Sequence, residues 1–583
     1  MECEDATWHS RVPFGALTTC NCQEESDGGG DVICETTVVT RGAAIRRHTG
    51  EVVSGPTLFV LAAYSLIFAG VTTVLSTRAN LNAVFGPIDD HEPLTWLNSD
   101  GRLGWRSFWT TAVDRTEIGQ WPDSSRFRPV YYLSRVGQAV LFGDAPQTWY
   151  LSVMLAFLLT LAAGGMATGL LLDWAGRWTN PLVRRAMLII SASVGILLVV
   201  GLDAWSGIVT RLGPAELPGL LLSIWGLLGI LLLVRTQSRW WWLLVLPSLT
   251  GAALSKETFV LAPAVALLTG AYLYFARGHR IVDALCGLGG LLSPILLIPV
   301  LAGSVGPTYV GEVSSDRVAA GVDFLLKVVP LYWLPGVVGL ALAYLVWVVA
   351  YGRFQRWTSL YVLTLLLWTL LLQFVDVIIY GGEYFHPRYW AIFGLAKILQ
   401  VLGALALSLG ALRSSQGLMF WCSAVALVLA LLMTGRLAES AFREIGQIRA
   451  EARANSVATQ EFMADLDSLL AALARHEPSQ LIIVVPTSAE YEPTVAILRG
   501  VERRSLRDIG FYLLPAMTAT DSQSPLGGVI VEAAQNGFPS LNVRPWPEFD
   551  SNMNVVCVFI NDEPHPIGPC RGYPWQEVRA RGM

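Results

Sequence analysis

Long apolar runs are the feature that most restricts what this chain can fold into. Of its 583 residues, 53% are hydrophobic and only 15% are charged. A soluble globular protein carries about 25% charged residues. The apolar residues are concentrated in runs, and about 20 apolar residues in a helix cross the hydrocarbon layer of a bilayer. The sequence therefore predicts a polytopic α-helical membrane protein.

About eleven segments are long and apolar enough to be predicted as membrane spans. The fifth and sixth are short and meet at Ser255, Lys256 and Glu257, where a single merged re-entrant pair is the alternative. The predicted spans are 57–75, 147–172, 183–202, 217–235, 239–254, 257–275, 283–302, 327–350, 357–379, 388–411 and 417–434.

The loops between these spans alternate in charge. Cytoplasmic loops of membrane proteins carry the excess of lysine and arginine. In every second loop the charged residues are almost all arginine. In the loops between them the charged residues are mixed or acidic. The sequence therefore predicts a multi-pass protein of a bacterial-type inner membrane, with a cytoplasmic N-terminus. The large first loop (76–146) and the C-terminal region are predicted to be extracytoplasmic. The arginines that decide this orientation are Arg46, Arg47, Arg177, Arg184, Arg185, Arg235, Arg239, Arg277, Arg280, Arg353, Arg356 and Arg413.

Composition divides the chain into three parts. Residues 1–56 are rich in Gly, Thr and acids without an apolar run, which predicts a disordered cytoplasmic tail. Residues 57–434 hold the spans. Residues 435–583 begin with a charged, helix-prone stretch, and strand-like and helix-like segments then alternate. This alternation predicts a small extramembrane α/β domain with a largely parallel sheet.

Charge and cysteine content limit the partners and cofactors. The net charge is −5 and no Lys/Arg-rich tract occurs, which argues against a nucleic-acid partner. Cys20 and Cys22 form a Cys-x-Cys pair without the spacing of a zinc site. Cys557 and Cys570 lie in the part predicted to face an oxidising compartment, where a disulfide between them is expected.

A cluster of acids follows the first span in the sequence GPIDDHE. It contains Asp89, Asp90, His91 and Glu92. A carboxylate close to the membrane surface can meet a lipid-borne substrate and take a proton from an acceptor hydroxyl. The alternative is a solvated turn, because Gly-Pro precedes the acids. Four consecutive residues do not converge easily on one ion, so no metal site is predicted, although a divalent cation stays an alternative.

Basic residues on the same predicted face are candidates for binding a phosphate. Arg388 opens the tenth span, and guanidinium geometry suits a phosphate; snorkelling toward the headgroups is the alternative. Lys256 and Glu257 lie at or near membrane depth, where ionisable groups are costly. They pair with each other, or Lys256 faces the same phosphate. Arg211 lies in the second outer loop, and Arg128 precedes the second span.

Four stretches resemble the GT-C superfamily of membrane glycosyltransferases, in particular its bacterial and O-mannosyltransferase-like branches. They cover 126–150, 254–263, 211–219 and 386–390. Their sequences are RFRPVYYLSRVGQAVLFGDAPQTWY, LSKETFVLAP, RLGPAELPG and HPRYW.

The resemblance implies inverting transfer of a hexose or pentose from a polyprenyl-phosphate donor to an acceptor on the outer face. The catalytic base would be Asp90 or Asp89, with Glu92 beside them. Arg388 and Lys256 would lie near the donor phosphate, and Tyr389 belongs to the matching Arg-Tyr pair. The acceptor would be a glycan, lipid or protein. The C-terminal domain does not resemble the tetratricopeptide array of the O-mannosyltransferase branch.

Two other functions fit parts of the sequence. A transporter or flippase of a lipid-linked glycan would carry polar residues deep in several spans. Asp376 and Lys397 are the main ones here. A membrane-anchored binding protein would instead depend on residues 440–583, and deleting them would leave no activity.

Overall fold

The structure is a computed structural model with two compact units, Met1–Gly55 and Pro56–Met583, which are treated separately. The residues whose structure is described are 16–23, 33–40, 55–87, 93, 96–98, 100–116, 128–277, 281–304, 319, 323, 330–351, 356–380, 387–475, 479–485, 491–504, 510–515, 543–545, 554–560 and 575–578.

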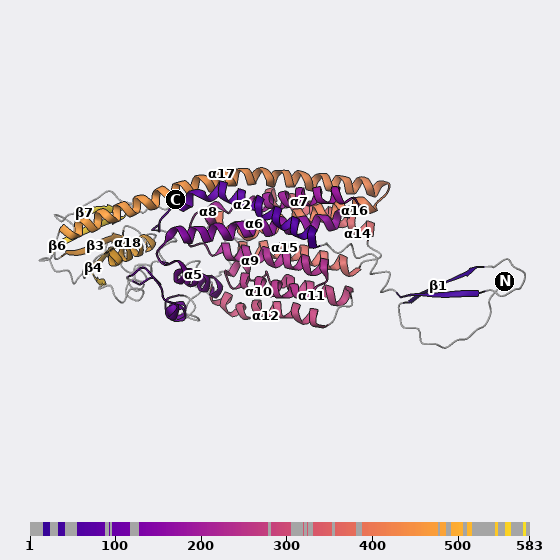
Figure 1. Cartoon of the computed structure of the whole chain (residues 1–583), viewed down its shortest axis with the longest axis horizontal. Helices are drawn as coiled ribbons and strands as arrows, with labels where there is room; N and C mark the ends of the chain where they lie inside the picture. The colour runs from indigo at the N-terminus through magenta and orange to yellow at the C-terminus, as the bar shows by residue number, and fades with distance from the viewer. Residues whose placement is uncertain are drawn as a thin grey trace, which may run out of the picture. The chain divides into compact units, whose positions relative to one another are not determined.

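The second unit is mostly helical (Figure 1). Its α-helices are α2 (Gly55–Thr77), α4 (Phe108–Asp114), α5 (Pro129–Phe142), α6 (Pro146–Gly176), α7 (Pro181–Val200), α8 (Ser206–Val209), α9 (Glu216–Thr236), α10 (Trp242–Ala253), α11 (Ala264–Arg277), α12 (Ile281–Ser304), α14 (Pro330–Tyr351), α15 (Arg356–Tyr380), α16 (Ala391–Ser414), α17 (Leu418–Arg475) and α18 (Tyr491–Arg504). Its 3-10 helices are η1 (Arg78–Asn82), η2 (Trp105–Ser107), η3 (Arg239–Trp241), η4 (Glu257–Phe259) and η5 (Pro387–Trp390).

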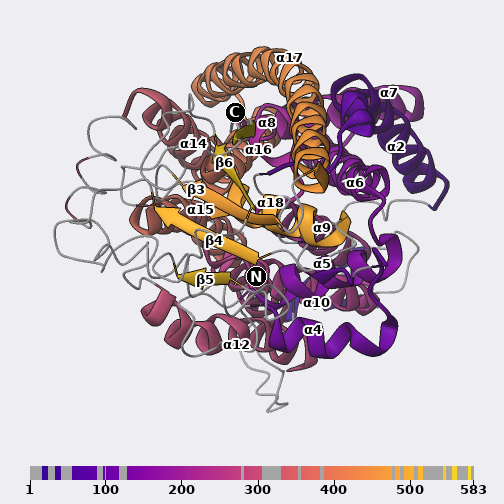
Figure 2. The ribbon, with the colours of Figure 1, turned by 90° about the vertical axis from the view of Figure 1, so that its left-hand side faces the viewer.

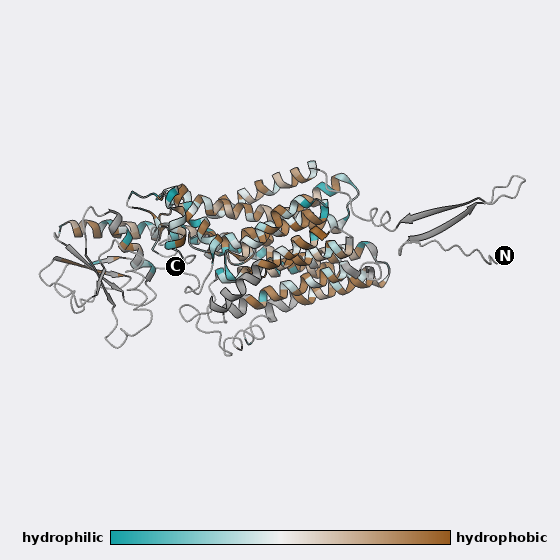
Figure 3. Cartoon of the chain, turned by 90° about the horizontal axis from the view of Figure 1, so that it is seen from below, coloured by the Kyte–Doolittle hydropathy of each residue, from teal (hydrophilic) through white to brown (hydrophobic). Residues whose placement is uncertain are grey.

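Several of these helices are apolar enough to cross a membrane, as predicted, and Figure 3 shows apolar residues along the bundle. Within the described residues, eight helices meet the length and composition of a span, not eleven. The predicted span 239–254 corresponds to α10, which has only 12 residues with Pro247 inside and reaches only about 18 Å. The predicted spans 283–302 and 327–350 correspond to α12 and α14, helices of 24 and 22 residues whose described apolar stretches are Ile281–Leu292 and Val337–Val349.

The starts of the helices follow local sequence rules. Proline occupies the first positions of α5, α6 and α7, where its missing N–H costs nothing. Asn180 caps α7 and accepts the N–H groups of Leu182 at 2.9 Å and Val183 at 3.3 Å. Local chemistry of this kind makes the helix boundaries readable from sequence.

One end of the bundle is fixed by a buried ionic network. Asp173 on α6 is held by the Nε and Nη2 atoms of Arg184 on α7, at 2.8 and 2.9 Å. It also accepts Nη2 of Arg235 on α9 at 2.9 Å. The network ties three helices together on the face predicted to be cytoplasmic.

The longest element is α17, a single helix of 58 residues. It runs along the bundle and continues beyond it to the strands (Figure 1). The predicted domain boundary at 434/435 therefore falls inside a continuous helix. The change from apolar to charged composition marks where the helix leaves the bundle, and not where a new fold begins, because a helix tolerates both kinds of residue on its surface.

The strands of the C-terminal region form a five-stranded sheet of order β5-β4-β3-β6-β7 with parallel pairing throughout. The α17 side chains Phe462, Leu466 and Leu469 pack with α18 and the sheet into one apolar core, and Figure 2 shows the strands beside these helices. The sequence SPLGGVIVEAAQNG (524–537) predicts a further helix in this region, and it lies outside the described residues. The strands are β3 (Ser479–Val485), β4 (Gly510–Pro515), β5 (Val543–Pro545), β6 (Asn554–Ile560) and β7 (Trp575–Val578).

The first unit contains a two-stranded antiparallel hairpin where the sequence predicted a disordered tail. Its strands are β1 (Ala16–Gln23) and β2 (Ile33–Thr40). Threonine and valine dominate the second strand, and β-branched residues favour extended backbone. The low hydrophobicity that suggested disorder does not prevent two such strands from pairing.

Candidate functional site

The acids proposed as catalytic lie outside the described residues. These are Asp89, Asp90 and Glu92. The described chain reaches Pro87, and Phe85 packs edge-on against Trp149 at the start of α6, with ring centroids 6.1 Å apart. The segment that leads to the acids is thus anchored to the bundle.

Lys256 lies at a sharp break between two helical segments. The preceding helix α10 ends at Ala253, and the backbone is extended at Lys256 (φ −160°, ψ 144°) before η4 begins. The side chain is buried, with 6% of its surface exposed. It forms an ion pair with Glu216, the first residue of α9, which is itself 3% exposed. Such a pair persists in a low-dielectric setting only because each charge compensates the other.

Tyr389 connects Lys256 with Arg388. The Lys256 Nζ atom lies 4.7 Å from the centre of the Tyr389 ring, and the Arg388 Cζ atom lies 5.2 Å from it. Arg388 Nη2 also donates to the Tyr389 hydroxyl at 3.4 Å. One aromatic ring therefore receives two cations, and cation–π attraction offsets part of their mutual repulsion.

The start of α5 joins the same group of loops. The N–H of Val130 donates to the carbonyl of Leu254 at 3.1 Å, only two residues before Lys256. The Tyr131 hydroxyl donates to the carbonyl of Gly213 at 2.7 Å, three residues before Glu216. These two bonds bring α5 and the loops before α9 and η4 together.

Arg128 immediately precedes α5 and is held by its aromatic neighbours. Its Nη2 donates to the Tyr132 hydroxyl at 3.0 Å, and its Cζ lies 5.4 Å from the centres of the Tyr131 and Tyr132 rings. We call Arg128, Glu216, Lys256, Arg388 and Tyr389 the basic cluster.

Two predicted site residues have other surroundings. Arg211 interacts electrostatically with Glu451 of α17, so it belongs to the contact between the second outer loop and α17. Glu257 opens η4 and is partly buried. The carboxylate bound to Lys256 is that of Glu216, not that of its sequence neighbour.

The second outer loop is fastened to α17 by three polar contacts. Glu444 accepts the N–H of Ser206 at 2.8 Å, and Ser440 donates to Asp203. Farther along α17, Asn455 Nδ2 donates to the carbonyl of Thr210 at 2.8 Å. Because α8 in this loop also lies against η5, α17 supports the element that carries Arg388.

The arrangement suits an anionic group better than a metal ion. Among the described members of the basic cluster, three cations accompany one buried carboxylate, and arginine and lysine are the usual ligands of phosphate. Among the residues that the structure describes, no group of three or more His, Cys, Asp or Glu side chains could hold a metal.

Comparison with family models, curated proteins and solved structures finds no match to this chain.

Glu216 is the residue of the basic cluster that sequence reasoning missed. From the sequence alone it lies in a polar connection five residues after Arg211. The sequence does contain a signal for its role. Glu216 lies in the stretch RLGPAELPG directly before an apolar run, and a carboxylate there is costly to bury unless it has a partner.

Proposed function

We propose that this protein is a GT-C-like membrane glycosyltransferase that uses a polyprenyl-phosphate-linked sugar as donor. The observation that carries the proposal is the basic cluster, in which Lys256 and Arg388 meet around Tyr389 at the ends of apolar helices. A lipid-borne phosphate approaching from the bilayer would meet positive charge there, while its polyprenyl tail stays among apolar helices.

In the proposed reaction, Asp90 or Asp89 takes the proton from an acceptor hydroxyl. The hydroxyl oxygen attacks the anomeric carbon, and the bond between that carbon and the phosphate oxygen breaks. The configuration at the anomeric carbon inverts, and polyprenyl phosphate leaves with one more negative charge on its phosphate. Lys256, Arg388 and Arg128 would stabilise this growing charge, because preorganised donors act most strongly where charge develops in the transition state.

A cysteine supports the proposed orientation. Cys557 lies in the central part of the sheet, is fully buried and is disulfide-bonded. Disulfides persist in oxidising compartments. The sheet is attached to the part of α17 that leaves the bundle, and the contacts of α17 with the second outer loop lie at the same end. The proposal therefore assigns this end to the extracytoplasmic side.

The decisive experiment is an assay with the purified protein in phospholipid vesicles. Radiolabelled polyprenyl-phosphate sugars are supplied as donors, and both transfer to a membrane-extract acceptor and slow hydrolysis of the donor are measured. Asp90→Asn and Asp89→Asn are compared singly and together. We expect the variant that removes the base to lose at least about 100-fold in rate, as for general-base catalysis elsewhere.

Asp100→Asn is the matched control. Asp100 is an exposed acid in the same loop, and its Oδ1 accepts the N–H of Arg102 at 3.1 Å. Its variant should retain wild-type turnover. If the double variant of Asp89 and Asp90 also retains it, neither aspartate is the base. If no donor is consumed by the wild-type protein, the proposed reaction is wrong.

A further inference from the structure

Arg135 on α5 is a buried arginine that has an unused hydrogen-bonding edge. The residue is 4% exposed. Its Nη1 donates to Gln138 Oε1 at 2.9 Å, but its Nε and Nη2 atoms are buried without a hydrogen-bond partner. Among the described residues, no carboxylate forms an ion pair with it. A buried cation in this condition is costly and calls for an anion.

A second arginine of the same chain shows what this edge binds. Arg184 uses its Nε and Nη2 atoms to hold both carboxylate oxygens of Asp173, at 2.8 and 2.9 Å. These two N–H groups point in parallel and match the two oxygens of a carboxylate or phosphate. In Arg135 the same two atoms are the ones left without a partner.

The Arg135 guanidinium is held rigidly in place. Its Cζ lies 4.9 Å from the centre of the Trp149 ring. Gln138, which accepts Nη1, donates in turn to Ser152 Oγ at 3.1 Å, and Ser152 Oγ donates to the Trp149 carbonyl at 2.7 Å. Stacking and a closed chain of hydrogen bonds therefore fix the plane of the guanidinium, so an anion would meet a preorganised fork.

We propose that the Nε–Nη2 edge of Arg135 is a binding site for a phosphate group. Arg128 immediately precedes α5, and Arg135 lies within that helix seven residues farther along the chain. The site is thus separate from the basic cluster and close to it. The inference concerns binding alone and does not depend on sugar transfer.

Two probes distinguish the source of the phosphate. The full-length protein is placed in nanodiscs of phosphatidylcholine, and its unfolding temperature is measured with added inorganic phosphate or with dioleoyl phosphatidic acid in the nanodisc. We expect at least one probe to raise the unfolding temperature of the wild-type protein. Stabilisation by phosphatidic acid alone identifies a lipid headgroup, and stabilisation by inorganic phosphate identifies a free anion.

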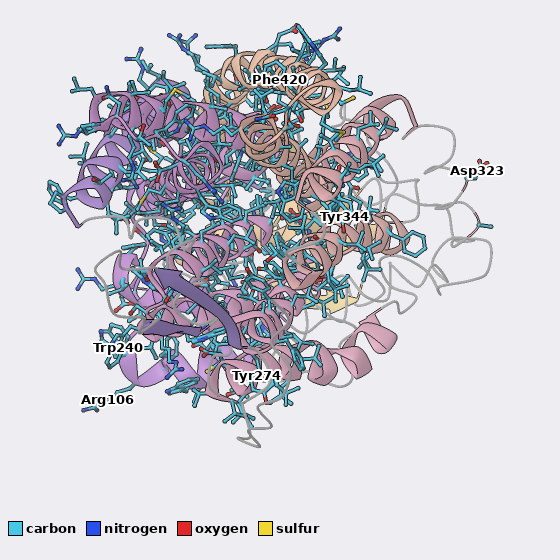
Figure 4. All side chains as sticks on the ribbon, turned by 90° about the vertical axis from the view of Figure 1, so that its right-hand side faces the viewer. Arg106, Trp240, Tyr274, Asp323, Tyr344 and Phe420 are labelled. Carbon is cyan, nitrogen blue, oxygen red and sulfur yellow. The ribbon has the colours of Figure 1, made fainter. Side chains whose placement is uncertain are left out.

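The variants test whether Arg135 is responsible. Arg135→Gln should weaken binding of the active probe at least tenfold. Arg135→Lys, which keeps the charge but not the fork, should also bind more weakly than the wild-type protein. Arg106→Gln is the control, because Arg106 is an exposed arginine of the same loop that points away from the helices (Figure 4). It should bind as the wild-type protein does.

Arg135→Met provides a readout that does not need the ligand. If the edge is empty without phosphate, an apolar side chain of similar length should lower the unfolding temperature of the ligand-free protein by no more than the loss of the Gln138 hydrogen bond and the Trp149 contact explains. A much larger fall, or failure to fold, would overturn the proposal. The proposal would also be overturned if a probe stabilised the wild-type and the Arg135→Gln proteins equally. The same holds if neither probe stabilised the wild-type protein.

Discussion

Lys256 and Glu216 form a buried ion pair between two turns that are 40 residues apart in the chain. The pair joins the start of α9 to the break before η4, and Tyr389 of η5 lies over the same ammonium group. The start of α9, the break before η4, and η5 therefore meet at the Lys256 ammonium group. The packing of this region therefore depends on these two side chains.

Lys256→Met should destabilise the protein by about 3–5 kcal/mol, because it leaves the Glu216 carboxylate buried without its counter-charge. Glu216→Leu should have a similar effect for the converse reason. The double variant removes both charges and should be markedly more stable than the sum of the two losses predicts. Unfolding in mixed micelles measures all three. Strict additivity would show that the two charges do not depend on each other.

Arg388→Gln should lower the rate of sugar transfer by about 100-fold, equivalent to about 2.7 kcal/mol, if the guanidinium stabilises the leaving phosphate. Arg413→Gln is the matched control. Arg413 lies near the other end of α16 and is likewise placed over an aromatic ring, with its Cζ 5.0 Å from the centre of Trp178. Equal losses in the two variants would indicate a structural effect on α16 and not a role in the reaction.

The orientation of the chain can be tested with two introduced cysteines. Arg106→Cys and Arg413→Cys are placed one at a time in a background in which Cys3, Cys20, Cys22, Cys34, Cys286 and Cys422 are serine, so that only Cys557 and Cys570 remain of the original eight cysteines. Both arginines are exposed. A membrane-impermeant maleimide added to intact cells should label position 106 only, and permeabilisation should expose position 413. The reverse pattern would place the basic cluster on the cytoplasmic side and contradict the proposed donor.

Two glycines test how closely α17 packs on the bundle. An added Cβ at Gly446 meets nothing within 4 Å, so Gly446→Ala should stabilise the helix by about 0.5–1 kcal/mol. At Gly201 the same atom would lie 2.5 Å from the carbonyl oxygen of Leu437. Gly201→Ala should therefore push α17 away and cost about 1–3 kcal/mol. Thermal unfolding measures both changes in stability. Equal effects of the two substitutions would argue against close contact between Gly201 and α17.

Cys557→Ser should destabilise the C-terminal sheet by about 2–5 kcal/mol, because the disulfide restrains the unfolded chain. Cys570→Ser should produce the same loss, since the sequence predicts Cys570 as the partner. Alkylation under non-reducing conditions, followed by mass spectrometry, identifies the linked peptides. Free thiols at both positions in protein isolated from its membrane would contradict an oxidising compartment.

The membrane class and most helix boundaries could be predicted from the sequence because they depend on local chemistry. Apolar runs and proline at helix starts act within a few residues of one chain segment. The alternation of strand and helix after residue 478 is equally local. LIIVV (481–485) and FYLLPA (511–516) predict strands and YEPTVAILRGVERR (491–504) predicts a helix, and β3, β4 and α18 lie at these segments. The count of spans failed at α10, where an apolar run was present but the helix was too short.

The partners of the charged side chains were decided by tertiary structure. Sequence proximity suggested that Lys256 pairs with Glu257, yet packing of α9 against the preceding turn supplies Glu216 instead. The bond from Val130 to Leu254 brings Arg128 into the same region, and the electrostatic interaction of Arg211 with Glu451 depends on α17 continuing past the bundle. The sequence by itself determined that the chain contains apolar helices able to cross a membrane and where most of them lie, because apolar composition is a property of each segment. Only the folded chain decided which charges meet, because their pairing depends on how distant segments pack.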